Sequence, residues 1–220
     1  MTAVEGVAVS LAHLREDYRL DELHEGDVDP DPLRQFALWF DEARQASRRE
    51  PNAMTVATAS ADGEPSARTV LLKAFDERGF VFYTHYDSAK GHDLAANPRA
   101  ALLFYWPELE RQVRISGTVE QVAHDESTAY FRGRPRGSQM AAAVSHQSAV
   151  LPSRERLHDD YARFEAEHEG GEIAPPEHWG GYRVAPAVYE FWQGRPSRLH
   201  DRLRYRRQPD DRWVIERLAP

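Results

Sequence analysis

The stretch EFWQGRPSRLHDR, residues 190–202, lies close to the end of the chain and carries its most informative pattern. Gly194, Pro196 and Ser197 are residues that favour turns, so the stretch predicts two strands joined by a polar turn. The incoming strand carries Trp192, and the outgoing strand is predicted over residues 198–206.

The two faces of the predicted outgoing strand differ in character, because side chains alternate along a strand. One face carries the basic residues Arg198, His200, Arg202 and Arg204, and the other carries Leu199, Leu203 and Tyr205. The apolar face is suited to a core. The basic face beside the flat indole of Trp192 suggests a site for a planar, phosphorylated ligand. A basic edge strand that deters edge-to-edge pairing explains the same spacing.

Length and composition limit the class of protein. The 220 residues fit one large domain. A net charge of −8 argues against a nucleic-acid-binding protein. No apolar run approaches the roughly 20 residues of a membrane span, and no export signal is seen, so we expect a cytoplasmic protein. The chain lacks cysteine, which excludes thiolate metal sites, and its ten histidines lack zinc-site spacing, so we expect no metal.

Hydrophobic periodicity predicts a mainly β protein with peripheral helices. Helices are expected at 11–18, 32–49, 88–96, 125–133, 138–144 and 153–169. Strands are expected at 54–60, 66–75, 80–84, 100–106, 111–123, 182–191, 198–206 and 212–218. Strands joined largely by hairpins favour an antiparallel barrel. Residues 1–9 are expected to be disordered, within a flexible segment over 1–20 that precedes a single domain over 21–220.

Three further groups of residues have the composition of anion-binding sites. Arg68 and Lys73 stand at the two ends of one predicted strand, where a regular strand would point them to opposite faces unless it is bulged. Lys90 follows Ser88 at the start of a predicted helix, whose free N–H groups can bind phosphate. The third group, Tyr130 to Gln139, contains three arginines and a serine that can bind a second phosphate. A charged strand end, a capped surface helix and a solvated loop explain the same patterns.

The stretch at 190–202 closely resembles the C-terminal signature of the pyridoxamine 5'-phosphate oxidases, and the resemblance extends from Leu14 to Pro220. It implies an FMN-binding split β-barrel and a homodimer with FMN at the subunit interface. It also implies oxidation of pyridoxamine or pyridoxine 5'-phosphate to pyridoxal 5'-phosphate by oxygen, with release of hydrogen peroxide.

The same resemblance implies roles for individual residues. The expected FMN-binding residues are Arg68, Thr69, Val70, Leu71, Leu72, Lys73, Tyr83, Thr84, Lys90, Gln112, Gln147, Ser148, Trp192 and Arg202. The expected substrate-binding residues are Arg15, Tyr18, Lys73, Tyr130, Arg134, Ser138, Arg198 and His200, of which Arg198 and His200 are also the expected catalytic residues. Ala89 departs from the family pattern, which often has arginine before the lysine.

Three other functions remain open. A protein with the same barrel can oxidise another substrate, such as a phenazine precursor. It can use a deazaflavin as a reductase, or bind pyridoxal phosphate without catalysis. A flavin spectrum and oxygen uptake distinguish these alternatives.

Overall fold

The computed structural model describes residues 11, 13–14, 17–47 and 49–220. Its helices are α1 (Pro32–Ala46), α2 (Ala89–Ala96), α3 (His124–Arg132), α4 (Arg136–Val144) and α5 (Arg154–Glu167), with short 3₁₀ helices η1 (Pro107–Leu109) and η2 (Pro196–Arg198). Its strands are β1 (Ala53–Ala59), β2 (Pro65–Leu71), β3 (Ala74–Asp76), β4 (Gly79–His85), β5 (Arg99–Trp106), β6 (Arg111–Gln121), β7 (Trp179–Gln193), β8 (Asp201–Arg207) and β9 (Trp213–Arg217). None of the described helices is long and apolar enough to cross a membrane.

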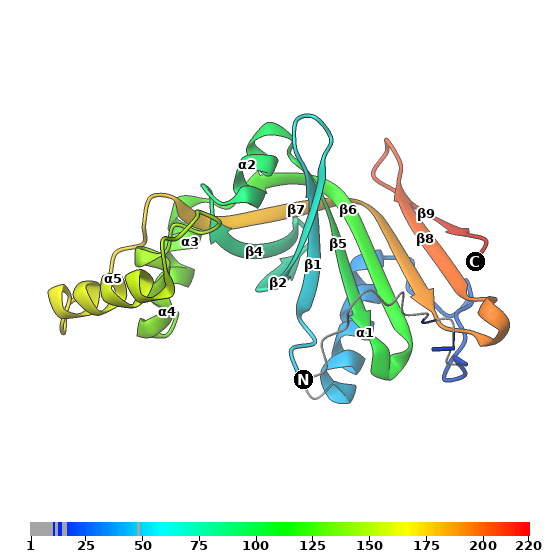
Figure 1. Cartoon of the computed structure of the whole chain (residues 1–220). Coiled ribbons are helices and arrows are strands. Elements are labelled where there is room, and N and C mark those ends of the chain that lie inside the picture. The colour runs from blue at the N-terminus through cyan, green and yellow to red at the C-terminus, as the bar shows by residue number, and fades with distance from the viewer. Residues whose placement is uncertain (1–10, 12, 15–16, 48) are drawn as a thin grey trace.

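The nine described strands form one antiparallel sheet, which curls into a half-barrel (Figure 1). Seven of them follow the order β2-β1-β5-β6-β7-β4-β3, and β8 and β9 branch from β7. The two ends of this path, β2 and β3, are separated by only Leu72 and Lys73. Three residue steps span at most about 11 Å, so the two edges of the sheet must approach each other. The predicted barrel is therefore confirmed as a split barrel.

Strand β7 is the spine of the fold. It pairs with β6 along most of its length, while its other edge pairs first with β4, through Val184, and then with β8, from Val188. Pro186 lies between these two partners, at a position where the sheet does not need a backbone N–H donor on that edge. The register between β6 and β7 shifts at this point, and a Cβ on Gly117 would lie 1.9 Å from the Ala185 carbonyl oxygen. The bulge thus requires glycine.

Helix α1 packs its apolar stripe into the half-barrel. Asp31 caps it by accepting a hydrogen bond from the Leu33 N–H at 2.9 Å, and Pro32 takes the first helical position, as predicted. Phe36 is fully buried, and its ring lies 4.9 Å from that of Phe80 and 5.1 Å from that of Phe104. Edge-on aromatic contacts of this kind join the helix to the sheet and form the main core.

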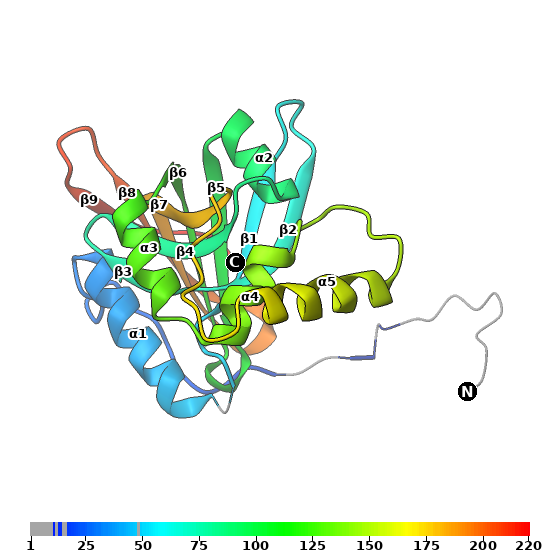
Figure 2. The same cartoon turned by 90° about the vertical axis from the view of Figure 1, so that its left-hand side faces the viewer.

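Helices α3, α4 and α5 gather at the end of the sheet where β7 begins (Figures 1 and 2). They cover a second, smaller core around Phe131, Met140, Ile173 and Trp179. This core is separate from the main core under α1. The region between the two cores is bordered by strands on one side and by helices on the other.

The structure corrects three predicted elements. The strand predicted over 198–206 begins only at Asp201, because Ser197 and Arg198 adopt left-handed backbone angles, with φ of 55° and 63°. Leu199 is consequently 69% exposed, although Leu203 and Tyr205 are fully buried. The strand predicted over 66–75 is divided at Leu72 and Lys73. The described residues of the helix predicted over 11–18 are not helical, and residues 1–9 lie outside the described residues.

Candidate functional site

A cavity of about 680 Å³ lies between β2, β4 and the starts of α2 and α4. Thirteen of the residues predicted to bind cofactor or substrate line it: Arg68, Thr69, Val70, Leu71, Lys73, Tyr83, Thr84, Lys90, Tyr130, Arg134, Ser138, Gln147 and Ser148. Three further lining residues are Ala89, Pro135 and Trp179. We call this space the first cavity.

Arg68 and Lys73 both line the first cavity because β2 ends between them. The backbone leaves the strand at Leu72, and the Lys73 N–H then donates to the Val81 carbonyl at 2.8 Å, in line with β3. The guanidinium of Arg68 is held by Thr58 Oγ1 at 2.6 Å and by Asp93 at 3.8 Å. The sequence left open whether Arg68 and Lys73 lie on opposite faces of a regular strand or on a bulged one. Because the strand is interrupted at Leu72, both side chains line the same cavity.

Lys90 lies in the first turn of α2 and is only 6% exposed. Its ammonium group donates to Gln147 Oε1 at 2.7 Å, Thr84 Oγ1 at 3.0 Å and Ser88 Oγ at 3.2 Å. All three acceptors are neutral. Burial, followed by the charge of Arg68, lowers the pKa of Lys90 to about 8. An anion in the cavity would supply the charge that these neutral acceptors do not.

The segment after α4 closes this end of the first cavity. Ser148 adopts a left-handed φ of 72°, and its Oγ accepts a hydrogen bond from the Ala89 N–H at 3.2 Å. Gln147 accepts from Thr84 Oγ1 at 2.8 Å as well as from Lys90. The start of α2, the end of β4 and this segment therefore share one hydrogen-bond network. Ala89 contributes its backbone alone to that network.

Arg134 lies on a stack of aromatic rings at the other end of the first cavity. The rings of Tyr83 and Tyr130 are 3.9 Å apart, those of Tyr83 and Trp179 are 5.4 Å apart, and the guanidinium of Arg134 lies 4.9 Å from the Trp179 ring. Burial lowers the pKa of Arg134. Its Nη1 is buried and has no hydrogen-bond partner among the described residues. A buried donor of this kind needs an acceptor, such as a phosphate oxygen.

The first cavity is strongly cationic although the whole chain is acidic. Four of its lining residues are basic, Arg68, Lys73, Lys90 and Arg134, and no carboxylate is found among the described residues that line it. Burial lowers the pKa of three of these groups, Arg68, Lys90 and Arg134. Asp93, the acidic partner of Arg68, does not line the cavity. Desolvated cations around a space without a lining carboxylate fit a ligand with anionic groups, and the aromatic stack fits a planar one.

A second cavity, of about 590 Å³, contains the turn before β8. It is lined by Leu14, Asp17, Tyr18, Trp192, Arg195, Ser197, Arg198 and His200, of which Tyr18, Trp192, Arg198 and His200 were predicted site residues. The rings of Trp192 and His200 lie 4.7 Å apart. Burial, followed by the charge of Arg198, lowers the pKa of His200. The second cavity thus holds the predicted catalytic pair.

Residues 19 and 20, which follow Tyr18 of the second cavity, are held through their backbone N–H groups. The carboxylate of Glu110 accepts hydrogen bonds from the N–H groups of Arg19, at 2.8 Å, and Leu20, at 3.0 Å. The ring of Tyr18 then lies 5.7 Å from that of Trp192, so close to Gly194 that a Cβ there would be 2.6 Å from Tyr18 Cγ. Arg15, another predicted substrate residue, lies outside the described residues.

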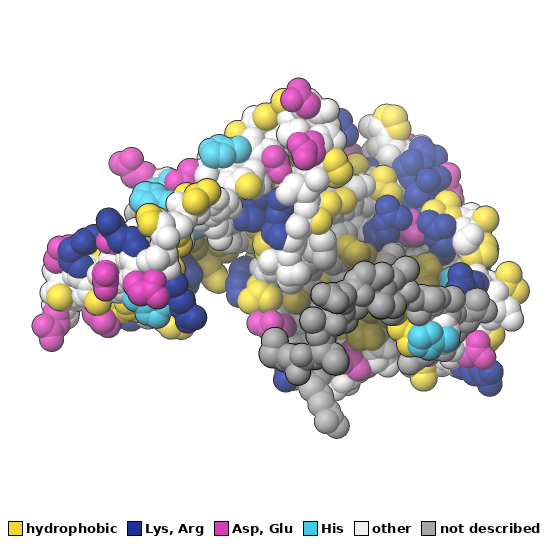
Figure 3. All heavy atoms as spheres, viewed as in Figure 1, with side chains coloured by type: hydrophobic (Ala, Val, Ile, Leu, Met, Phe, Trp, Pro, Cys, Tyr) yellow, Lys and Arg dark blue, Asp and Glu magenta, His cyan; other side chains and the backbone are white. Residues whose placement is uncertain are grey.

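The remaining predicted residues are separated from the first cavity. Gln112, Trp192 and Arg202 face one another in register across β6, β7 and β8, so they share one face of the sheet. Arg202 pairs with the buried Glu190 at 2.8 Å. Basic side chains gather on the part of the surface formed by β8 and β9 (Figure 3). Leu72 is buried in the main core instead of lining a cavity.

The two cavities lie at opposite ends of β7. Trp179 begins the strand and lines the first cavity, whereas Trp192 lines the second cavity at the far end. Thirteen steps along an extended strand correspond to about 40 Å. One chain therefore does not bring Arg198 and His200 to the first cavity. Sequence reasoning missed Trp179, whose only signal is an aromatic residue directly before the last long strand.

Comparison with known proteins identifies the family. Residues 40–168 match the family model described as pyridoxamine 5'-phosphate oxidase, and residues 179–220 match the pyridoxine 5'-phosphate oxidase C-terminal dimerisation region. The chain is 57% identical to a pyridoxine/pyridoxamine 5'-phosphate oxidase of Trichormus variabilis and 58% identical to one of Cupriavidus necator. Each alignment covers 96% of this chain and 99% of the relative.

Solved structures give the same result. The chain resembles PhzG from Burkholderia lata, crystallised with tetrahydrophenazine-1-carboxylic acid, with a TM-score of 0.85, 35% identity and coverage of 91% of this chain and 99% of that one. An FMN-binding protein from Nostoc punctiforme shares the fold, with a TM-score of 0.71, 18% identity and coverage of 88% and 100%. Family model, relatives and fold agree, and the chain belongs to the pyridoxamine 5'-phosphate oxidase family of enzymes.

Proposed function

We propose that the protein is an FMN-dependent oxidase that converts pyridoxamine 5'-phosphate, pyridoxine 5'-phosphate or both to pyridoxal 5'-phosphate. Oxygen is the acceptor and hydrogen peroxide the second product. The observation that carries this proposal is the first cavity, where desolvated cations surround a stack of aromatic rings without a lining carboxylate among the described residues. Family membership supports the choice of substrate.

FMN fits the residues around the start of α2. Arg68 and Lys90 would hold its phosphate at the start of α2, and Gln147 and Ser148 offer polar contacts beside it. The volume of about 680 Å³ lies within the range of small-molecule and cofactor sites. Bound FMN supplies an acceptor for a hydride equivalent and returns the electrons to oxygen.

The substrate phosphate fits the other end of the first cavity. Arg134 presents its unpartnered Nη1, and Tyr130, Ser138 and Lys73 add polar groups along the same wall. The pyridine ring would then lie in the part of the cavity bordered by Tyr83 and Trp179. These residues bind and orient the substrate; they are not placed to move a proton.

We propose a homodimer in which the second cavity of one subunit completes the first cavity of the other. The matched dimerisation region, residues 179–220, contains β7, β8 and β9 and therefore both Arg198 and His200. In this arrangement Trp192, Arg202 and Gln112 lie on the FMN side. The dimer accounts for the placement of the two cavities at opposite ends of β7 within one chain.

Arg198 and His200 have complementary tasks in this proposal. No hydrogen bond or ion pair engages the exposed Arg198 within the described part of the chain, so its charge is available to the substrate. His200 Nδ1 accepts a hydrogen bond from the Arg195 N–H at 3.1 Å, so a neutral ring carries its proton on Nε2. Its lowered pKa keeps the ring neutral at pH 7. His200 would thus orient the substrate as a hydrogen-bond donor.

The N-terminal segment, residues 1–20, would cover the substrate site of this dimer. Tyr18, beside Trp192 and His200, is the described residue that supports this proposal. Residues 21–220 would form the single FMN-binding domain, and the cytoplasm remains the expected location.

Oxygen consumption by FMN-reconstituted protein given pyridoxamine 5'-phosphate tests the proposed function, with absorbance of the aldehyde as the second readout. Uptake together with product is the expected result. A yellow protein that consumes no oxygen would contradict it and favour an oxidase of another substrate, such as a phenazine precursor; PhzG, the structural neighbour, was crystallised with tetrahydrophenazine-1-carboxylic acid. Bound vitamer without uptake would indicate a binding protein, and a protein unable to take up FMN would indicate a deazaflavin enzyme.

Replacing Arg134 by alanine should raise KM for pyridoxamine 5'-phosphate by roughly 10- to 100-fold, the worth of a charge-assisted hydrogen bond, with kcat nearly unchanged. The reason is that the phosphate is bound equally in the ground and transition states. Steady-state kinetics measures both constants. Arg132→Ala is the matched control, because Arg132 pairs with Glu172 on the exposed side of α3. An unchanged KM in Arg134→Ala would contradict the assignment.

Replacing Arg198 by alanine should lower kcat by about 100-fold or more while leaving the Kd for FMN within about twofold, because Arg198 acts on the substrate. Lys90→Met should show the reverse order, with weaker FMN binding as its first effect. Stopped-flow reduction and flavin fluorescence quenching separate the two quantities. Parallel loss of bound flavin and turnover in Arg198→Ala would refute the role.

The affinity for FMN should fall as pH rises above about 8. The pKa of Lys90 lies near 8 in the unliganded protein, and a bound phosphate raises it, so the ammonium form binds and the neutral amine does not. The Kd should therefore increase by up to tenfold per pH unit between pH 8 and the pKa of the complex. Flavin fluorescence titrations from pH 6.5 to 9.5 measure this. Lys90→Met should bind more weakly and lack the pH step; a step of the same size in that variant would exclude Lys90 as its source.

A further inference from the structure

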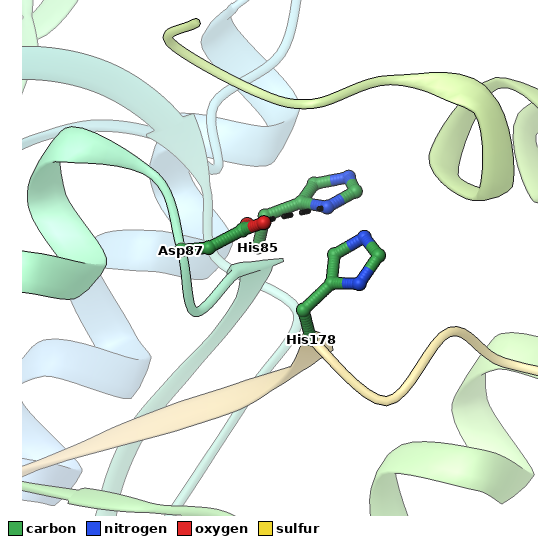
Figure 4. Close-up of side chains that lie close together, drawn as sticks. All are labelled: His85, Asp87 and His178. Atoms are coloured by element: carbon green, nitrogen blue, oxygen red, sulfur yellow. Dashed lines mark ion pairs between the residues drawn. The ribbon is translucent and has the colours of Figure 1, made fainter.

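Two histidines and an aspartate lie close together where β4 ends and β7 begins (Figure 4). His85 ends β4, Asp87 follows it by two residues, and His178 directly precedes β7. One ligand atom from each lies within 4.8 Å of the other two, and His85 Nδ1 is 3.9 Å from Asp87 Oδ1. The two histidines are far apart in sequence, so their spacing gave no sign of a shared site.

The nitrogen atoms of this cluster lack the partners that buried polar atoms require. His85 is 5% exposed, yet its Nδ1 has no hydrogen-bond partner in the described structure. His178 Nε2 is also buried and, among the same residues, unpartnered. The two rings lie 5.1 Å apart at 27°, so they do not bond to each other. Two orphaned nitrogens aimed into one small space, with a carboxylate beside them, point to a missing ligand.

We propose that His85, Asp87 and His178 bind a divalent transition-metal ion, for which Zn²⁺ is the best fit. Imidazole nitrogens and a carboxylate oxygen are its usual ligands, and three protein ligands leave a fourth position open. Tetrahedral bonds of about 2.1 Å place ligand atoms about 3.4 Å apart, so the cluster must contract slightly. Asp87 can supply this movement, because its side chain is 41% exposed.

The position of the ion would connect the two strands that carry the first cavity. His85 follows Thr84 and His178 precedes Trp179, and both of these neighbours line the cavity. His85 and Trp179 are register partners, and the Tyr86 N–H donates to the His178 carbonyl at 2.6 Å. A bound ion would fasten the end of β4 to the start of β7 at this point. Its role would be structural, because its ligands do not line the cavity.

The surrounding charges limit the affinity of this cluster for Zn²⁺. Lys90 and Arg134 lie close enough to act on His85, and their charges oppose a cation, while Asp87 favours one. Burial of His85 favours its neutral ring, which is the metal-binding form. We therefore expect micromolar binding of one Zn²⁺ per chain.

Isothermal titration of the tag-free, full-length protein with Zn²⁺ tests the proposal. Asp87→Asn and His178→Asn should each weaken the Kd at least tenfold. Asp159→Asn and His158→Asn are matched controls, since they make the same changes at exposed positions of α5 and should bind as the wild type does. Asp87 is exposed, so its variant should fold, as circular dichroism would verify.

Thermal unfolding gives an independent measurement. At a free Zn²⁺ concentration about 100 times the Kd, the unfolding temperature should rise by roughly 5 °C in the wild type and both controls, but not in the two site variants. The proposal is overturned if the wild type binds no Zn²⁺. It is equally overturned if Asp87→Asn and His178→Asn bind Zn²⁺ with wild-type affinity, which would place any bound ion elsewhere.

Discussion

The organising constraint of this structure is the burial of positive charge around a space that contains no negative charge of its own. Lys90 is held by three neutral oxygens, and Arg134 rests on aromatic rings with a guanidinium nitrogen unpaired in the described structure. Desolvation makes both cations costly, and an anionic ligand removes that cost. The unliganded cavity therefore carries a desolvation cost that an anionic ligand would relieve.

Strand β7 determines where the two cavities lie relative to each other. It carries one cavity at each end, and its partner changes from β4 to β8 around Pro186. The bulge at Gly117 lets β6 stay paired with β7 on both sides of Pro186. A single strand thereby fixes the positions of the cationic wall of the first cavity and of the Arg198–His200 turn. Because the strand separates the two cavities within a chain, the proposed function requires a second subunit to unite them.

Much of the fold and of the first cavity could be predicted from the sequence, because both follow from local patterns. Alternation gave the strands, and Asp31–Pro32 gave the start of α1. Prediction failed where unusual backbone angles, or contacts between residues far apart in sequence, determine the position of a side chain. The left-handed angles of Ser197 and Arg198 replace the first residues of the predicted outgoing strand by a turn, so Arg198 and His200 precede β8. The pairing of β4 with β7, which are far apart in sequence, places Trp179 at the cavity and His85 beside His178.

The contact between Glu110 and the N-terminal segment has a consequence for sequence variation. The carboxylate binds the backbone N–H groups of residues 19 and 20, which every amino acid except proline possesses. These two hydrogen bonds are therefore independent of the side chains of residues 19 and 20. Both positions can accept substitutions other than proline while Glu110 keeps the backbone in place, whereas Tyr18 beside them contacts Trp192 and His200 through its ring.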